Sequence, residues 1–151
     1  MKRFQFRLQT VLDYRTEQLD QAQQAVAREQ TRLNDLRRQL SETDTFIEST
    51  LQQQAERQQS GDFDIAQAVA FPLYLIRLKE QRALQYQAIL QQETLLNEAR
   101  AALQEALIRK KSLDCLKEKQ QTQHTRQIEK HQEQALEEIA LNQFYRKRKP
   151  A

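Results

Sequence analysis

The sequence predicts an all-α protein in which two long helices form an antiparallel coiled-coil hairpin. Its composition favours helix, since Ala, Glu, Lys, Leu and Arg supply about half of the chain, the share typical of coiled coils. Apolar residues recur every seven positions in two long stretches. A single break lies between the stretches, and it contains the one glycine of the 151 residues.

The first helix is expected over about residues 6–58. One core position of its heptad repeat is apolar in six successive heptads: Leu12, Leu19, Val26, Leu33, Leu40 and Ile47. A seven-residue repeat held over this length indicates a left-handed supercoil. The other core position is weaker because it includes Arg15, Glu29 and Thr43.

The reversal is expected over about residues 59–71, around the sequence Ser60-Gly61-Asp62-Phe63-Asp64. Glycine permits positive φ, and Asp and Ser compete for backbone hydrogen bonds, so this segment favours a turn. Asp64 is expected to cap a short turn over residues 65–70. The second helix is then predicted to begin at Pro72, since proline fits the first position of a helix.

The second helix is expected over about residues 72–147, with its best seam between Ile89 and Leu113. Folding back at the break pairs seam residues of the two helices: Val26 with Leu103, Leu33 with Leu96, and Leu40 with Ile89. The longer second helix leaves a C-terminal overhang without a partner inside this single hairpin domain.

The sequence contains few residues arranged for catalysis or for binding a cofactor or a metal. One glycine rules out a phosphate-binding glycine loop, and a two-helix hairpin has no pocket that excludes water, so we expect no enzyme activity, cofactor, metal site or small-molecule substrate. His124 and His131 are expected on the solvated surface. Cys115 is alone, which excludes an internal disulfide, and it is expected to be a small packing residue.

No signal peptide and no apolar run long enough for a membrane span is visible, so a cytoplasmic protein is expected. The net charge is +3, and bases gather near both termini whereas acids gather between Glu42 and Asp64. Ordinary solubilising charge also explains this distribution.

Four segments resemble the flagellar export protein FliJ family: Phe4–Leu12 with Arg15, Phe71–Leu78, Lys111–Lys119 and Glu133–Ala140. The resemblance implies an antiparallel coiled coil similar to the central stalk subunit of rotary ATPases. It also implies a component of the type III export apparatus, peripherally associated with the inner membrane. The implied partners are the hexameric export ATPase, the export-gate membrane protein and export chaperones.

The export-gate site that the resemblance places near the hairpin tip is predicted at Gln39, Phe46, Tyr74 and Leu78. The alternative is that these residues only close the end of the coiled coil. Thr43 and Thr50 stand where the family pattern suggests larger residues.

The ATPase site is predicted at the chain ends, at Phe4, Phe6, Ile128, Leu136, Ile139, Phe144, Arg146, Lys147 and Arg148. An isolated amphipathic helix is marginal in water, so the apolar face of the overhang is expected to pack on an external partner such as the pore of a hexamer. The alternative is a frayed end without function.

Two other functions stay open at this point. One is the stalk of a virulence-type III secretion ATPase. The other is a coiled coil that binds nucleic acid, motivated by the basic termini. Acids interleave with bases along both helices, so no continuous basic stripe supports nucleic-acid binding, and we expect none.

Overall fold

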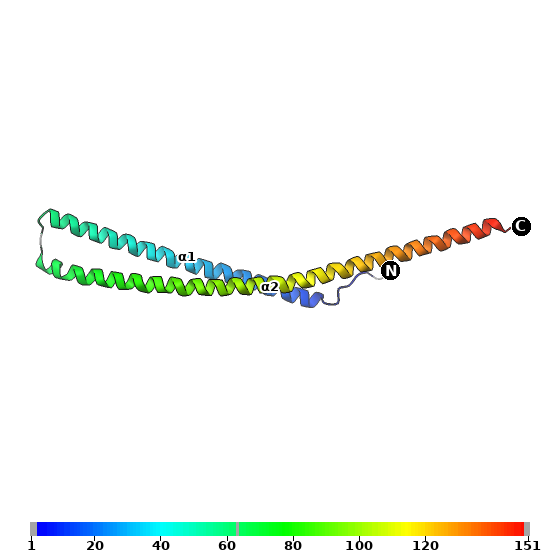
Figure 1. Ribbon diagram of the computed structural model, residues 1–151, viewed down its shortest axis with the longest axis horizontal. Helices are drawn as coiled ribbons and strands as arrows, with labels where there is room; N and C mark the ends of the chain where they lie inside the picture. The colour runs from blue at the N-terminus through cyan, green and yellow to red at the C-terminus, as the bar shows by residue number, and fades with distance from the viewer. Residues whose placement is uncertain (1–2, 63, 150–151) are drawn as a thin grey trace. The chain divides into compact units, whose positions relative to one another are not determined.

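The computed structural model describes residues 3–62 and 64–149, and Phe63 of the expected reversal lies outside them. The described chain forms two helices, α1 (Gln9–Gln59) and α2 (Ile65–Arg148), and no strand (Figure 1). The predicted all-helical fold class is therefore confirmed. Contacts divide the chain into a hairpin unit of residues 20–105 and a terminal unit formed by the residues up to Leu19 and from Ala106 onward.

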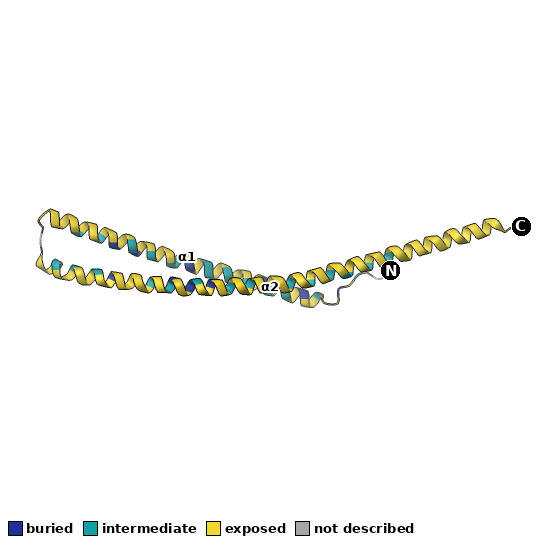
Figure 2. Cartoon of the chain, in the orientation of Figure 1, coloured by how far each residue is buried: buried dark blue, intermediate teal, exposed yellow. Residues whose placement is uncertain are grey.

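The hairpin unit is held together by an apolar seam between α1 and α2. Leu33, Ile89 and Leu96 are its buried centre, and Val26, Leu36 and Leu40 pack against them. The buried and half-buried positions recur mainly at intervals of three and four residues on both helices, and they are dark blue and teal in Figure 2. Leu33 and Leu96, and likewise Leu40 and Ile89, belong to this one cluster, as the antiparallel pairing predicts.

Ion pairs flank the seam and follow the same antiparallel alignment. Arg37 pairs with Glu93 at 3.0 Å, and Arg82 pairs with Asp44 at 2.7 Å. Arg82 is exposed, and its ion pair with Asp44 lies at the edge of the seam. Exposed pairs of this kind contribute about 0.2–1 kcal/mol each, so the apolar cluster is the main source of stability.

Polar side chains lie inside the seam at the core position of α1 that the sequence predicts to be the weaker one. Gln92, 7% exposed, donates from Nε2 to the Glu29 carbonyl oxygen at 3.2 Å and also to the Glu29 carboxylate. The hydroxyl of buried Thr43 donates to the Gln39 carbonyl oxygen at 3.0 Å. Buried polar groups are costly when unpaired, so these hydrogen bonds are what make the positions tolerable.

Gly61 adopts the positive φ expected at the reversal, but the second helix begins earlier than the sequence predicts. Gly61 has φ +73°, a conformation open to glycine. Asp64 caps α2 itself: its Oδ1 accepts from the Ala66 N–H at 3.0 Å, and its carbonyl oxygen accepts from the Ala68 N–H at 3.0 Å. The capped helix begins at Ile65 and carries Pro72 inside it, so the prediction of a helix start at Pro72 was wrong.

Two features keep the turns before Pro72 helical, although proline favours the first position of a helix. Asp64 accepts hydrogen bonds from backbone N–H groups in the first turn of α2. Ala68 and Phe71 are half-buried, and their packing holds the turns before the proline in place. A bond from Arg57 Nη1 to Gln67 Oε1 at 3.2 Å adds a link between α1 and these turns. Proline inside a helix still removes one hydrogen bond and crowds the carbonyl four residues back.

Replacing Pro72 with alanine should therefore stabilise the first turns of α2. The local gain is expected to be about 2–3 kcal/mol, and Pro72→Gly, the matched control, should recover about 1 kcal/mol less. Hydrogen exchange of the amides of residues 68–71 measures this gain directly. If these amides already exchange in the parent protein at the rate of an unstructured peptide, then α2 does begin at Pro72.

The terminal unit packs the start of the chain along α2. Phe6, Leu12 and Leu19 are buried, and Gln9 Oε1 accepts from Lys117 Nζ at 2.9 Å. The half-buried residues of α2 in this unit again recur every three or four positions: Ala106, Lys110, Leu113, Lys117, Gln120, His124 and Ile128.

Two side chains of the terminal unit differ from expectation. His124 is half-buried, and its ring lies 5.6 Å from that of Phe4, measured between centroids, so the prediction of a solvated histidine was wrong. The reason is that His124 continues the series of half-buried positions on α2, and Phe4 from the non-helical segment before α1 packs against it. Cys115 is exposed and is not a packing residue, whereas His131 is exposed as predicted.

Candidate functional site

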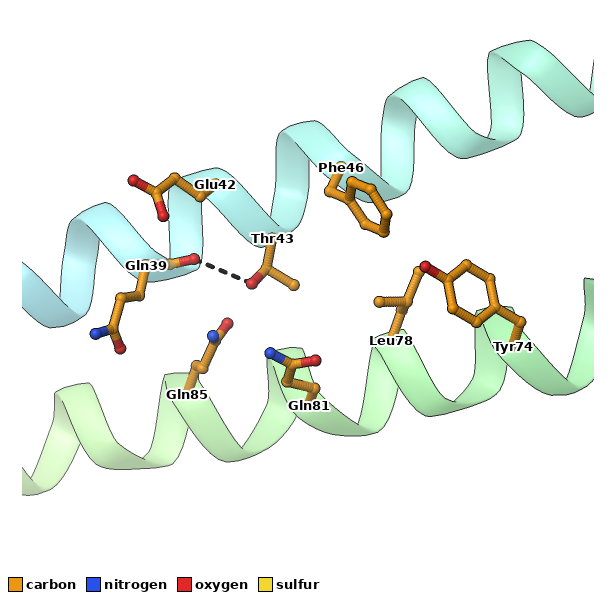
Figure 3. A pocket seen from close by; sticks show the side chains of 8 residues that line it. All are labelled: Gln39, Glu42, Thr43, Phe46, Tyr74, Leu78, Gln81 and Gln85. Atoms are coloured by element: carbon orange, nitrogen blue, oxygen red, sulfur yellow. Dashed lines mark hydrogen bonds between the residues drawn. The ribbon is translucent and has the colours of Figure 1, made fainter.

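An open hollow lies between α1 and α2 in the hairpin unit, on the tip side of the buried cluster (Figure 3). Its volume is about 680 Å³. It is lined by Gln39, Glu42, Thr43 and Phe46 of α1 and by Tyr74, Leu78, Gln81 and Gln85 of α2. The structure therefore brings together all four residues predicted for the export-gate site.

One end of the hollow is aromatic and apolar. The rings of Phe46 and Tyr74 meet edge to face, with centroids 6.4 Å apart and an interplanar angle of 79°. Leu78 lies beside them and is buried, but Phe46 is 50% exposed and Tyr74 43% exposed. Large aromatic surface that stays open beside a hollow is typical of the anchors of protein interfaces.

The other end of the hollow is polar. Gln39, Thr43, Gln81 and Gln85 stand here, and the side-chain oxygen of Gln85 is buried without a hydrogen-bond partner among the described residues. The chain itself covers this oxygen, whereas the side-chain amides of Gln39 and Gln81 are exposed and can bond to a partner.

Sequence reasoning missed Glu42, Gln81 and Gln85 as lining residues. The signal that identifies them is helical spacing, because residues three and four apart share a face. On α1 this rule joins Glu42 to Gln39 and Phe46; on α2 it joins Gln81 and Gln85 to Leu78.

The residues predicted for the ATPase site fall into two groups in the terminal unit. Phe4, Phe6 and Ile128 are buried or half-buried within the unit. The remainder are exposed: Leu136, Ile139, Phe144, Arg146, Lys147 and Arg148. Phe6 is only 8% exposed, so it supports the local packing and offers no free surface.

Exposed apolar side chains at the end of α2 are not confined to the one face expected from the sequence. Leu136 is 66% exposed and Tyr145 is 66% exposed, and nine residues of helix place them on opposite sides. Leu141 and Phe144 are exposed as well, and all described residues beyond Lys130 are exposed (Figure 2). Apolar side chains thus remain exposed on opposite sides of this segment, interleaved with polar residues such as Glu137 and Asn142.

Basic residues complete this end of α2. Arg146, Lys147 and Arg148 form its last turn, where the helix dipole favours cations. The Arg148 guanidinium lies 5.5 Å from the ring centroid of Phe144, which holds one of the cations beside the aromatic surface.

Within residues 3–62 and 64–149, no group of three or more His, Cys, Asp or Glu is arranged to hold a metal ion. None of the helices in that part of the chain is long and apolar enough to cross a membrane.

The family described as flagellar FliJ protein matches residues 4–149, which is nearly the whole chain. Comparisons with curated proteins and with solved structures find no match. The family match agrees with the two-helix architecture and includes both the hollow and the exposed end of α2. The chain therefore belongs to the flagellar FliJ family and is a component of the flagellar protein export apparatus.

Proposed function

We propose that this protein is a non-enzymatic stalk that binds the hexameric flagellar export ATPase, promotes its assembly and activity, and links it to the export gate and to export chaperones. In this role it associates peripherally with the export apparatus at the inner membrane. The observation that carries the proposal is the exposed end of α2, which presents apolar side chains on opposite sides and bases in its last turn.

The end of α2 fits the central opening of a ring better than a flat surface. A flat partner covers one face of a helix, whereas the ring can contact Leu136 and Tyr145 on opposite sides at once. The three bases of the last turn would meet acidic groups inside the opening and speed the encounter through long-range attraction.

The hollow in the hairpin unit is the candidate for the export-gate contact. Phe46 and Tyr74 offer the apolar anchor, and the exposed side-chain amides of Gln39 and Gln81 offer hydrogen-bonding groups at the other end. A segment of the gate protein with an apolar side chain followed by a donor would satisfy both ends.

The family match favours the flagellar apparatus over a virulence-type secretion system as the place of this function. The residues that carry the proposal lie on two separate surfaces, so the chain has the means to bind two partners at once.

Co-purification tests the proposed function. The full chain should bind the hexameric export ATPase of the same organism and raise its rate of ATP hydrolysis, and a virulence-type ATPase should bind more weakly. The double charge reversal Lys147→Glu with Arg148→Glu should weaken ATPase binding, mainly through slower association. A full chain that neither binds nor stimulates the ATPase would contradict the proposal.

A further inference from the structure

We propose that the first residues of the chain form a strap that keeps α2 helical through a polar stretch, so that the exposed end of α2 is a stiff extension of the packed part of the terminal unit. The strap is residues 3–8, and the polar stretch is residues 117–127. Phe4 and Phe6 are then positioning residues for the ATPase contact and do not form it. Only this consequence for binding rests on the proposed function; the strap itself does not.

The strap differs from the helices in the period of its buried side chains. Residues 3–8 precede α1, and their exposure alternates: Phe4 is half-buried and Phe6 is buried, whereas Arg3, Gln5 and Arg7 are exposed. A period of two is typical of an extended chain with one side covered, since successive side chains point to opposite sides. In a helix the two phenylalanines would point in widely different directions. The strap therefore turns both aromatic rings inward.

Two contacts place the strap on α2. Gln9, the first residue of α1, accepts a hydrogen bond from Lys117 Nζ at 2.9 Å, and the Phe4 ring lies 5.6 Å from the His124 ring. Since α1 begins at Gln9, it does not extend over the positions of α2 that follow Lys117 in this antiparallel alignment. Gln120 and His124 are half-buried nevertheless. The strap thus continues the cover that α1 provides over about two more turns of α2.

The composition of α2 explains why this cover matters. Residues 117–127 contain no aliphatic side chain, and all described residues after Lys130 are exposed. Without the strap, α2 would run unsupported from Lys117 to its end at Arg148, over roughly thirty residues. A helix that packs on nothing is marginal in water, and a polar helix gains least from its own side chains. The strap therefore supports the part of α2 that is least able to stay helical alone.

Direct contact of the two aromatic rings with the ATPase is the competing role. Phe6 is 8% exposed, so its ring has almost no surface left for a partner. Phe4 is half-buried, and its ring packs against His124. A partner would have to pull the strap off α2 to reach these rings. The geometry therefore favours an effect on binding that acts through the shape of α2.

A distance between two spin labels on α2 tests the strap in the protein alone. Cys115 is exposed and is the one cysteine of the chain, so it takes the first label, and Gln134→Cys, at an exposed position, takes the second. The roughly nineteen residues of helix between them correspond to about 28 Å. The parent should give a narrow distribution near this distance. The strap variant, Phe4→Ser with Phe6→Ser, should give a broader distribution with a shorter mean.

The matched control for the strap variant is Gln5→Ser with Arg7→Ser, which changes the two exposed positions between and after the phenylalanines. This control should keep the distance distribution of the parent. Phe4→Leu with Phe6→Leu should keep it as well, because leucine retains the apolar cover.

Hydrogen exchange measures the same release without labels. Protection of the amides of residues 120–127 should fall at least about tenfold in the strap variant, since burial of one phenylalanine stabilises by more than the 1.4 kcal/mol that a tenfold change represents. The amides of residues 89–96, in the buried seam, should keep their protection and serve as the internal reference.

A helix-favouring pair of substitutions distinguishes positioning from direct contact. Thr122→Ala with Thr125→Ala replaces two exposed residues of the polar stretch with the best helix former. The strap variant should lose ATPase affinity, because affinity follows the fraction of chains whose end is helical. Adding the alanine pair to the strap variant should restore both the distance distribution and most of the lost affinity.

Three results would overturn the proposal. An unchanged distance distribution and unchanged exchange in the strap variant would show that α2 is stiff without the strap. Loss of ATPase binding with an unchanged distance would make Phe4 and Phe6 direct contacts, and so would an alanine pair that restores the distance but not the affinity. A parent chain that does not bind the ATPase contradicts the proposed function instead, while the distance and exchange measurements still decide whether the strap exists.

Discussion

Removing residues 131–151 should abolish binding to the export ATPase and stimulation of its hydrolysis. All described residues after Lys130 are exposed, so the removed segment contributes almost nothing to packing inside the chain. The cut keeps half-buried Ile128 and the contact between Phe4 and His124. Thermal unfolding of the truncated protein should therefore stay close to that of the parent, while co-purification with the ATPase is lost.

Variants of full length distinguish the effect of losing the apolar surface from the effect of shortening α2. Leu136→Gln with Ile139→Gln and Phe144→Gln should reproduce most of the binding defect, because glutamine keeps helix propensity and removes the apolar surface. The matched control is Gln132→Ala with Gln134→Ala, two exposed polar positions on the same part of α2. Truncated protein that still binds and stimulates the ATPase at full strength would exclude the end of α2 as the docking element.

Phe46→Ala combined with Tyr74→Ala should weaken binding of the export-gate protein by at least about thirtyfold. Aromatic anchors of an interface typically cost 2 kcal/mol or more when they are truncated. About half of the surface of each ring is open to solvent, so the loss of their mutual contact should change stability much less than binding. Isothermal titration with the purified gate protein, beside circular dichroism of the variant, measures the two effects.

Tyr86→Ala serves as the control for this variant. Tyr86 is 56% exposed on α2 but does not line the hollow, so its removal should leave gate binding unchanged. A large drop in helicity or melting temperature of the Phe46 and Tyr74 variant would instead support the alternative, in which the aromatic pair closes the end of the coiled coil.

The seam of this protein could be predicted almost residue by residue. Leu12, Leu19, Leu33 and Ile47 are buried where the seven-residue repeat places them. This accuracy has a physical cause: a two-helix seam is determined by spacing along each helix, and a break with one glycine leaves few ways to fold back. The hollow could be located because the family resemblance places a binding site near the hairpin tip, where Phe46 and Tyr74 lie.

The features that sequence did not reveal depend on contacts outside the repeat. Pro72 lies inside α2 because a cap at Asp64 and anchored turns before the proline outweigh its local preference. His124 is covered by Phe4, which belongs to a segment with no helical period. The position of His124 does continue the three- and four-residue spacing of half-buried residues on α2, but the polar residues between Lys117 and Gln127 hide this in the sequence.

The hydrogen bonds from Gln92 to Glu29 have a consequence for the hollow. In an apolar seam of uniform heptads, one helix can slip past the other by seven residues and still place apolar side chains together. Such a slip would set Gln92 opposite Ala22 or Leu36 and leave the Glu29 carboxylate without its partner inside the seam. An unpaired polar group inside the seam costs free energy. The hydrogen bonds between Gln92 and Glu29 therefore disfavour such a slip and keep the two helices in register. One heptad of slip would also move Phe46 about 10 Å away from Tyr74, so the shape of the hollow depends on a polar pair about five helical turns away from it.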